Sequence, residues 1–277
     1  MSDFTDDWLT LRAEADRRAR SGADLDAALI DGLQEAGVGA DPVRIVDLGA
    51  GQGNNLRYLA PVLAKAFSAG QHWTLVDSDG GLLAAAQAPD VAGLRVATQR
   101  CDLAEDLSAV ALDAADLVTA SALVDLVSAA WVQRFAEDCA TAKVPVCLIA
   151  LTVDGRLDWT PEAPEDREVA ELFLQHMQGD KGFGPALGAD GPQALADAFE
   201  AVGYQVARRD SAWRLDSRDA DLQRALVEGY KQAAQELAPA RAAEIDAWAD
   251  QRLHHIGAGV STHTVGHEDL LAVRRGG

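Results

Sequence analysis

The amino-acid sequence predicts an α/β fold in which a mostly parallel sheet is covered by helices on both faces. Short apolar, β-branched runs alternate with amphipathic helical segments between residues 43 and 153. Strands that alternate with helices imply right-handed crossovers and therefore parallel pairing. Two of these runs, 43–48 and 73–77, also carry an acid at or next to their carboxyl end. Ligands of such sheets bind outside the carboxyl ends of the strands, so we expect a ligand site at that edge.

The elements of the first half follow from periodicity and from glycine and proline signals. Residues 5–36 read as two helices broken at Ser21-Gly22. The segment 54–69 reads as a helix with Pro61 as a kink or break, and two more helices are expected at 81–88 and 129–142. The expected strands are 43–48, 73–77, 94–100, 115–121 and 144–153.

The second half is less regular. Residues 154–189 contain a helical pattern and a glycine-rich run, and we expect an insertion that folds over the sheet edge. A helix at 192–202, a strand at 204–215 with a bend at Ser211, and two helices at 219–237 and 239–256 follow. We expect Gly266-His267-Glu268 to form a turn before a closing strand at 269–273.

The charge of the chain excludes several classes of partner. The formal net charge is -20, with no basic block to compensate. Nucleic acids and anionic membrane surfaces would repel such a protein, because both are recognised through basic faces. Arg17, Arg18 and Arg20 form the densest basic group, and we expect them on a solvated helix face.

The cysteine and histidine patterns indicate a reduced, metal-free protein. The three cysteines, Cys101, Cys139 and Cys147, are odd in number and scattered, which argues against disulfides and Cys-x-x-Cys metal sites. No signal-peptide pattern and no apolar stretch of roughly 18 residues is present. We therefore expect a cytoplasmic protein. The histidines of the C-terminal third lack metal-ligand spacing: His254, His255, His263 and His267.

A glycine loop follows the first predicted strand. Its sequence is Gly49-Ala50-Gly51-Gln52-Gly53. Dinucleotide-binding loops have the pattern G-x-G-x-x-G, in which glycines bring a helix N-terminus close to a pyrophosphate. Here Asn54 takes the place of the later glycine, and no Lys-Ser or Lys-Thr pair of a phosphate loop follows. The loop therefore favours a cofactor without phosphates, while an NAD-linked oxidoreductase stays as an alternative.

Asp47 followed by this loop resembles the first motif of the class I, Rossmann-like S-adenosylmethionine-dependent methyltransferases. The resemblance covers residues 43–153 well, and the C-terminal half agrees in layout. It implies a doubly wound, mostly parallel seven-stranded sheet with N-terminal helices and helical insertions. It further implies that the loop wraps the amino-acid end of S-adenosylmethionine and that the product is S-adenosylhomocysteine.

Two further acids complete the expected cofactor site. Asp77 follows Gly53 by 24 positions (77 minus 53) and ends the second strand, where a carboxylate accepts hydrogen bonds from ribose hydroxyls. The resemblance implies that Asp102, after the third strand, accepts the adenine amino group. The expected cofactor-binding residues are Asp47, Gly49, Ala50, Gly51, Gly53, Asn55, Asp77, Ser78, Asp102, Leu103 and Ser121.

The residues that face the methyl acceptor are less well defined. The stretch 122–127 resembles the family's fourth-strand motif, which makes Asp125 a candidate base or substrate contact. His176 is a second candidate base. Lys181 or Arg214 would hold an anionic substrate, and Phe183 and Trp213 are further candidate contacts. Arg12 and Arg20, on the N-terminal helices, are expected to be solvated, with capping of the cofactor carboxylate as the alternative. The motifs of DNA, arginine and catechol methyltransferases are absent, which favours a small-molecule acceptor.

Together these observations predict two regions and one activity. Residues 1–42 would form a helical cap, and residues 43–277 the methyltransferase domain, with a lid at about 154–189 and a helical pair at about 219–257. The predicted activity is methyl transfer to an oxygen or nitrogen atom of a small metabolite. A non-catalytic protein that binds adenosylmethionine or a nucleoside, and an enzyme that modifies a cationic protein, remain alternatives. The sequence leaves the acceptor unnamed and the choice between monomer and homodimer open.

Overall fold

The structure is a computed structural model that describes residues 6–105 and 107–275. In this part of the chain, eight strands form one sheet in the order β3-β2-β1-β4-β5-β8-β6, and β7 pairs with β8 beside that path. The strands are β1 (Val43–Leu48), β2 (Gln71–Asp77), β3 (Leu94–Arg100), β4 (Leu117–Ser121), β5 (Val146–Thr160), β6 (Tyr204–Asp210), β7 (Trp213–Leu215) and β8 (Thr262–Arg274).

The strand pairing confirms the doubly wound arrangement expected from the sequence. β1 pairs in parallel with β2 and β4, β3 with β2, and β4 with β5, whereas β8 is antiparallel to both β5 and β6. The predicted strand at 204–215 is two strands, because the chain bends at Ser211, whose amide donates to the carbonyl of His267. Its second part, β7, adds an eighth strand to the seven expected.

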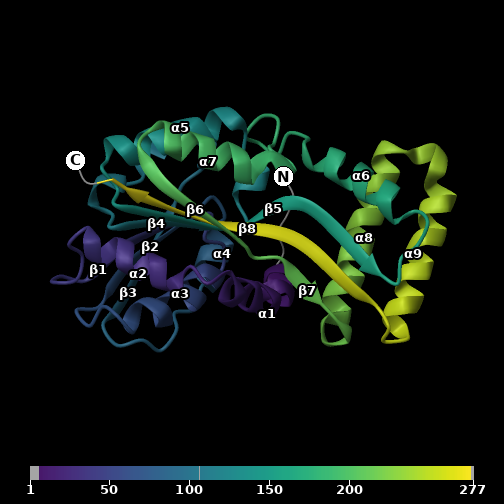
Figure 1. Cartoon of the computed structure of the whole chain (residues 1–277), viewed down its shortest axis with the longest axis horizontal. Helices are drawn as coiled ribbons and strands as arrows, with labels where there is room; N and C mark the ends of the chain where they lie inside the picture. Colours follow the sequence, from purple (N-terminus) through teal and green to yellow (C-terminus); the bar gives the residue numbers. More distant parts are fainter. Residues whose placement is uncertain (1–5, 106, 276–277) are drawn as a thin grey trace.

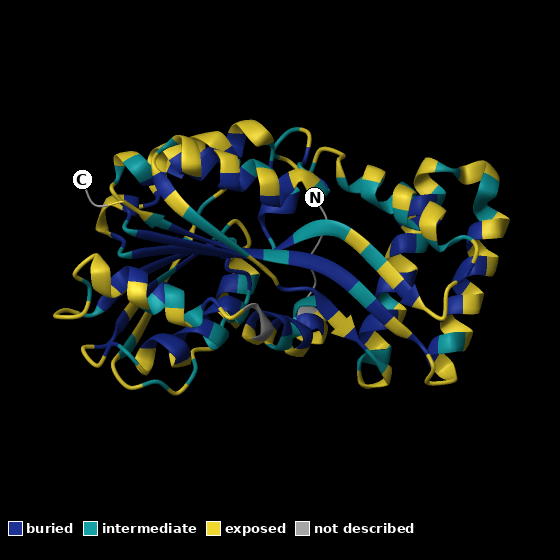
Figure 2. Cartoon of the chain, viewed as in Figure 1, coloured by how far each residue is buried: buried dark blue, intermediate teal, exposed yellow. Residues whose placement is uncertain are grey.

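Helices cover both faces of the sheet. In Figure 1, α5 and α7 lie on one face and α2 and α3 on the other, while Figure 2 shows the buried strands between them. The helices are α1 (Asp6–Ala23), α2 (Asp26–Glu35), α3 (Asn54–Ala64), α4 (Gly80–Ala85), α5 (Ala129–Thr141), α6 (Asp166–Met177), α7 (Gly191–Ala201), α8 (Ala220–Leu237) and α9 (Ala242–Gly257).

Strands β5 and β8 extend well beyond the parallel part of the sheet. Val146 pairs with Val273 at one end of the two strands, and Thr160 pairs with Thr262 at the other. At the far end they carry β7 and the helices α6, α8 and α9, which we call the outer lobe (Figure 1). A separate apolar core holds it together, with buried aromatic residues Trp159, Trp213, Tyr230 and Trp248.

The expected turn at Gly266-His267-Glu268 is wrong, because β8 runs without interruption through these residues. Three residues of β5 bulge out opposite Gly266, between the pairs Val153–His267 and Leu157–Val265. A Cβ atom on residue 266 would overlap the Asp154 carboxylate. The glycine therefore allows close approach of two strands and does not reverse the chain.

Several element boundaries also differ from those expected. The first two helices separate at Asp24 and not at Ser21-Gly22, and Asp24 takes a positive φ of 53°. The expected first helical residue, Thr5, lies outside the described residues. Pro61 lies inside α3, which ends at Ala64 and not near residue 69. Residues 154–160 continue β5, so α6 begins the helical part of the expected insertion.

Candidate functional site

A cavity of about 420 Å³ lies at the carboxyl ends of the parallel strands. The glycine loop after β1 forms its floor, and residues that follow β2, β3 and β4 line it in turn. This is the edge at which open parallel sheets bind ligands. Its volume falls in the range of roughly 300–1,000 Å³ that is typical of small-molecule and cofactor sites.

The glycine loop keeps its shape through backbone conformations that favour glycine. Gly49, Gly51 and Gly53 have φ values of 63°, 53° and 81°. A Cβ on residue 49 would lie 3.2 Å from Leu123, and one on residue 51 would lie 3.3 Å from Leu9. The loop is therefore closely packed on two sides and presents its backbone to the cavity.

Asp77 ties the end of β2 to this loop. Its Oδ2 accepts a hydrogen bond of 2.8 Å from the Gly51 amide, and its Oδ1 accepts one of 2.9 Å from the Asp79 amide. Each carboxylate oxygen has a second lone pair. The side chain also lines the cavity, so it can accept hydroxyl groups of a ligand while it holds the loop.

Asp102 marks the opposite end of the cavity, after β3. Its Oδ1 accepts the amide of Ala104 at 3.0 Å, which fixes the turn. The neighbouring Leu103 lines the cavity, and its carbonyl accepts the indole N–H of Trp131 at 2.7 Å. An apolar side chain beside an exposed carboxylate is suited to a flat heterocycle with an amino group.

Asp47 lies beneath the loop and does not reach the cavity. It is fully buried, and its Oδ1 accepts the amide N–H of Asn55 at 2.7 Å. Burial raises the pKa of this carboxyl to about 7, against the lowering effects of Asn55 and the Arg20 guanidinium. Asn55 also donates to Thr119 on β4, so Asp47 positions strand ends and not a ligand.

The N-terminal helix α1 closes one side of the cavity. The carbonyl of Leu9 accepts the side-chain N–H of Asn54 at 2.8 Å, and Leu9, Arg12 and Asp16 line the cavity. Arg12 and Arg20 are 7% and 4% exposed, so the expectation of solvated arginines is wrong for both. Arg12 is held by Asp16 at 2.9 Å, which compensates the burial of both charges.

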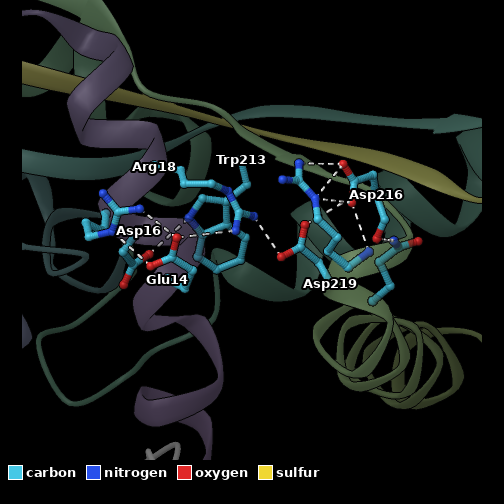
Figure 3. A network of polar contacts seen from close by, with 9 residues as sticks. Glu14, Asp16, Arg18, Trp213, Asp216 and Asp219 are labelled. Atoms are coloured by element: carbon cyan, nitrogen blue, oxygen red, sulfur yellow. Dashed lines mark hydrogen bonds and ion pairs between the residues drawn. The ribbon is translucent and has the colours of Figure 1, made fainter.

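The same helix is tied to the outer lobe (Figure 3). Asp16 accepts the indole N–H of Trp213 at 3.0 Å, and Arg18 forms an ion pair of 2.7 Å with Asp219 at the start of α8. Asp219 and Asp216 form a capping box around the turn before α8. Helix α1 therefore bridges the glycine loop and the outer lobe.

A short loop after α6 forms the opposite wall. The Asp180 carboxylate accepts the amides of Gly182 and Gly184, at 2.7 and 3.1 Å, which closes the loop on itself. Lys181 and Phe183 line the cavity from this loop. The Phe183 ring meets Trp131 edge-on with a centroid distance of 5.9 Å.

The structure brings most of the expected cofactor residues to one cavity. Those that line it are Gly49, Ala50, Gly51, Asn55, Asp77, Ser78, Asp102, Leu103 and Ser121. Asp47 and Gly53 support the loop from below and do not line the cavity.

The expected acceptor-side residues divide into two groups. Lys181 and Phe183 line the cavity, while Asp125 is buried beside it, between the lining residues Leu123 and Leu126. Burial raises the pKa of Asp125 to about 6.

The remaining expected residues lie elsewhere. His176 bonds Glu236 of α8 at 2.9 Å, Trp213 bonds Asp16, and Arg214 is exposed and pairs with Asp210. Among the described residues, no group of three or more His, Cys, Asp or Glu side chains could hold a metal ion, and no helix is long and apolar enough to cross a membrane.

Sequence reasoning expected an N-terminal cap but did not identify which side chains of α1 form the wall. Leu9, Arg12 and Asp16 carry no local signal of a site, because their role depends on packing against a loop about 40 residues further along the chain. The residues after β4 that line the cavity, Ala122, Leu123 and Leu126, lie in the stretch already singled out around Asp125.

Comparison with known proteins supports the fold. No family model matches the chain, and no curated protein matches it by sequence. A loganic acid methyltransferase with bound S-adenosylhomocysteine shares 10% identity and a TM-score of 0.53, over 97% of this chain and 96% of that one.

Two further structures are similar at lower TM-scores. Phosphoethanolamine N-methyltransferase 2 of Haemonchus contortus shares 15% identity and a TM-score of 0.47 over 99% of this chain, which spans 59% of that enzyme. A cyclopropane synthase of Mycobacterium tuberculosis shares 12% identity and a TM-score of 0.45, over 98% of this chain and 100% of that one. The strand order and the similarity to the loganic acid methyltransferase together show that the chain has the fold of the class I methyltransferases.

Proposed function

We propose that the protein is an S-adenosylmethionine-dependent methyltransferase that acts on a small molecule. The observation that carries the proposal is the arrangement of Asp77, Asp102 and the glycine loop around one cavity at the strand ends. The fold is used by enzymes of this class, but fold alone does not define an activity, so the argument rests on the site. The loop lacks the later glycine of dinucleotide sites, which favours a cofactor without a pyrophosphate.

Each end of the cofactor has a matching group in the cavity. Asp77 would accept the ribose hydroxyls, and Asp102 would accept the adenine amino group beside Leu103. Gly49 and Gly51 would let the backbone approach the amino-acid end, close to Ser121 at the end of β4. The bound cofactor would supply a methyl group on a sulfonium, which is already a good leaving group.

The protein's own contribution would be alignment and exclusion of water. Apolar side chains from three separate segments surround the inner part of the cavity: Leu9, Leu123, Leu126 and Phe183. They would keep solvent from the reacting atoms when α1 and the loop after α6 are closed. We infer that residues 1–42 act as a cap and that the 154–189 segment supplies the opposite lid.

The acceptor would enter between these two walls. Lys181 would attract an acceptor that carries negative charge. Asp125 would take up a proton when the acceptor is a protonated amine or hydroxyl, because a pKa near 6 leaves the carboxyl ionised at neutral pH. His176 has no part in this proposal, since Glu236 holds it on the surface of α6.

Calorimetry with S-adenosylmethionine, S-adenosylhomocysteine and NADH tests the proposal. We expect both adenosyl compounds to bind with one-to-one stoichiometry and NADH not to bind. Asp77→Asn should weaken binding of S-adenosylhomocysteine by about tenfold or more, because hydrogen bonds to a charged group are lost. Asp90→Asn, at an exposed acid outside the cavity, is the matched control. Folded wild-type protein that binds neither adenosyl compound would rule the proposal out.

A further inference from the structure

A second recess lies beside the cofactor cavity, between α1 and α3. Its volume is about 310 Å³, and it shares four lining residues with the larger cavity: Asp16, Asn54, Asn55 and Ser121. Other residues line the recess and not the larger cavity, among them Arg17, Arg20, Arg57 and Tyr58. The two spaces therefore adjoin but have different chemistry, since three arginines and two acids line the smaller one.

Arg20 is buried in this recess without full compensation. It is 4% exposed, its Nη1 donates to Asn55 Oδ1 at 2.6 Å, and its guanidinium lies 4.1 Å from the centre of the Tyr58 ring. Its Nε has no hydrogen-bond partner among the described residues, and the Asp269 carboxylate lies 3.8 Å away. A guanidinium removed from water in this way is costly unless a further partner binds it.

Arg57 supplies a second cation, for which no carboxylate of the described residues lies within ion-pair distance. In the part of the chain that the structure describes, its guanidinium donates to the Gln52 carbonyl at 2.7 Å and to the Asn54 side chain. Arg17, by contrast, is already paired with Glu14 at 2.7 Å. Two acids, Glu14 and Asp16, also line the recess, but they pair with Arg17 and Arg12. Arg20 and Arg57 are thus cations that neither of these two acids pairs with, which suits a carboxylate or phosphate.

The size of the recess indicates more than one functional group. A water molecule takes roughly 30 Å³ in the liquid, so 310 Å³ corresponds to about ten waters. The carboxylate of a bound cofactor would fill a small part of that space. Ser121 ends β4, Leu151 lies within β5, and both line the recess. The recess therefore lies beside the end of the cofactor cavity that is remote from Asp102.

We propose that this recess binds the methyl acceptor through an anionic group, a carboxylate or a phosphate, held by Arg20 and Arg57. The inference rests on the proposed function, because it places the acceptor next to a bound cofactor. It narrows the substrate class to small anionic molecules. A cationic protein or a neutral apolar metabolite would not suit the two arginines.

The test uses protein saturated with S-adenosylhomocysteine and titrated with malonate or inorganic phosphate. We expect at least one of the anions to bind in the millimolar range and Arg57→Gln to weaken that binding by about tenfold. Arg20→Gln should also weaken anion binding. Arg57→Gln is the preferred variant, because Arg20 also donates a hydrogen bond to Asn55. The control is Arg167→Gln, at an arginine whose side chain is 90% exposed on α6.

A second experiment distinguishes a carboxylate of the acceptor from the carboxylate of the cofactor. Binding of S-adenosylhomocysteine is compared with that of 5′-methylthioadenosine, which lacks the amino-acid end. We expect Arg57→Gln to leave the ratio of the two affinities unchanged within about twofold, because a change transmitted through the Gln52 carbonyl of the glycine loop would affect both ligands. If it weakens S-adenosylhomocysteine alone, the recess holds the cofactor's own carboxylate and the inference is overturned.

The two proposals fail in different ways. If wild-type protein binds S-adenosylhomocysteine but neither anion, the proposed function stands and the anionic acceptor is refuted. If wild-type protein binds no S-adenosylhomocysteine, the proposed function fails and the inference fails with it.

Discussion

The indole N–H of Trp213 donates a hydrogen bond of 3.0 Å to Oδ1 of Asp16, which lies 197 residues earlier in the chain. Asp16 lines both the cofactor cavity and the arginine recess, and it also holds Arg12. One carboxylate thus connects β7 of the outer lobe with the helix that covers the glycine loop. This contact is one of several that hold α1 over the site, together with those of Leu9 and Arg18.

Removing the hydrogen bond between Trp213 and Asp16 should make α1 less firmly held over the cavity. Trp213→Phe keeps an aromatic ring against Trp8, whose centroid lies 6.4 Å away, but removes the donor. We expect affinity for S-adenosylhomocysteine to fall about tenfold or more, because a hydrogen bond to a charged group contributes about 1.5–3 kcal/mol. Stopped-flow fluorescence should show that the loss arises from faster dissociation.

A matched variant separates this effect from a general loss of stability. The indole of Trp248 donates to Asp166 at 2.9 Å inside the outer lobe, away from α1. Trp248→Phe should lower the unfolding midpoint as much as Trp213→Phe and leave the dissociation rate unchanged. Equal dissociation rates for the two variants would show that the Trp213 hydrogen bond does not hold α1 over the cavity.

The glycine loop should not tolerate a side chain at its centre. Gly51→Ala places a Cβ 3.3 Å from Leu9 at a φ of 53°, so either α1 or the loop must shift. We expect at least tenfold weaker binding of S-adenosylhomocysteine in calorimetry. Gly203→Ala, at a φ of 91° with no atom within 4 Å of the new Cβ, should cost stability without affecting binding.

Asp47 should make the protein less stable as the pH rises. Its folded pKa of about 7 lies above the ordinary value of 3.8, so between these values the folded state keeps a proton that the unfolded state has lost. The free energy of unfolding therefore falls through this window, by up to about 1.4 kcal/mol per pH unit.

Asp47→Asn isolates this contribution, since asparagine can still accept the Asn55 hydrogen bond. The variant's advantage in unfolding free energy should grow from near pH 4 to near pH 7 and then stay constant. Denaturant titrations of both proteins across this range measure it, and effects of other buried acids cancel in the difference. A constant difference over the window would contradict the assignment.

His263 should have the opposite effect on the acid side. Its ring stacks on Trp159 at 3.6 Å, and its nitrogens contact the Tyr230 hydroxyl and the Asp158 carbonyl. Burial lowers its pKa from 6.5 to about 3, so the unfolded chain binds a proton that the folded chain refuses. Stability should fall as the pH drops from about 6.5 toward 3. His263→Gln should flatten this fall in the same titrations, although its stability at neutral pH will be lower.

Local sequence was sufficient to predict the parallel sheet and the cofactor end of the site. The run at 43–48 is apolar and β-branched and ends at glycines, so its role as a buried strand needs no distant information. Asp77 and Asp102 follow directly from strand ends, because the carboxyl ends of parallel strands meet at one edge. These residues line the cavity as expected.

Features that depend on distant partners could not be predicted in this way. Gly266 looks like a turn residue, yet it lies inside β8 because the bulge of β5 occupies the space beside it. Arg12 and Arg20 look solvated on a charged helix, yet Asp16 and Asn55 bind them in the interior. In each case the deciding neighbour is set by the tertiary fold and carries no periodic signal.

The path of β8 has a consequence for how the chain is made. This strand pairs with β5, β6 and β7, and it spans both the sheet and the outer lobe. Among the described residues it follows every other strand in sequence, at Thr262–Arg274. During synthesis from the N-terminus, β6 and β7 therefore have no partner strand until residues 262–274 leave the ribosome. A nascent chain that stalls before residue 262 would expose the unpaired edges of β6 and β7.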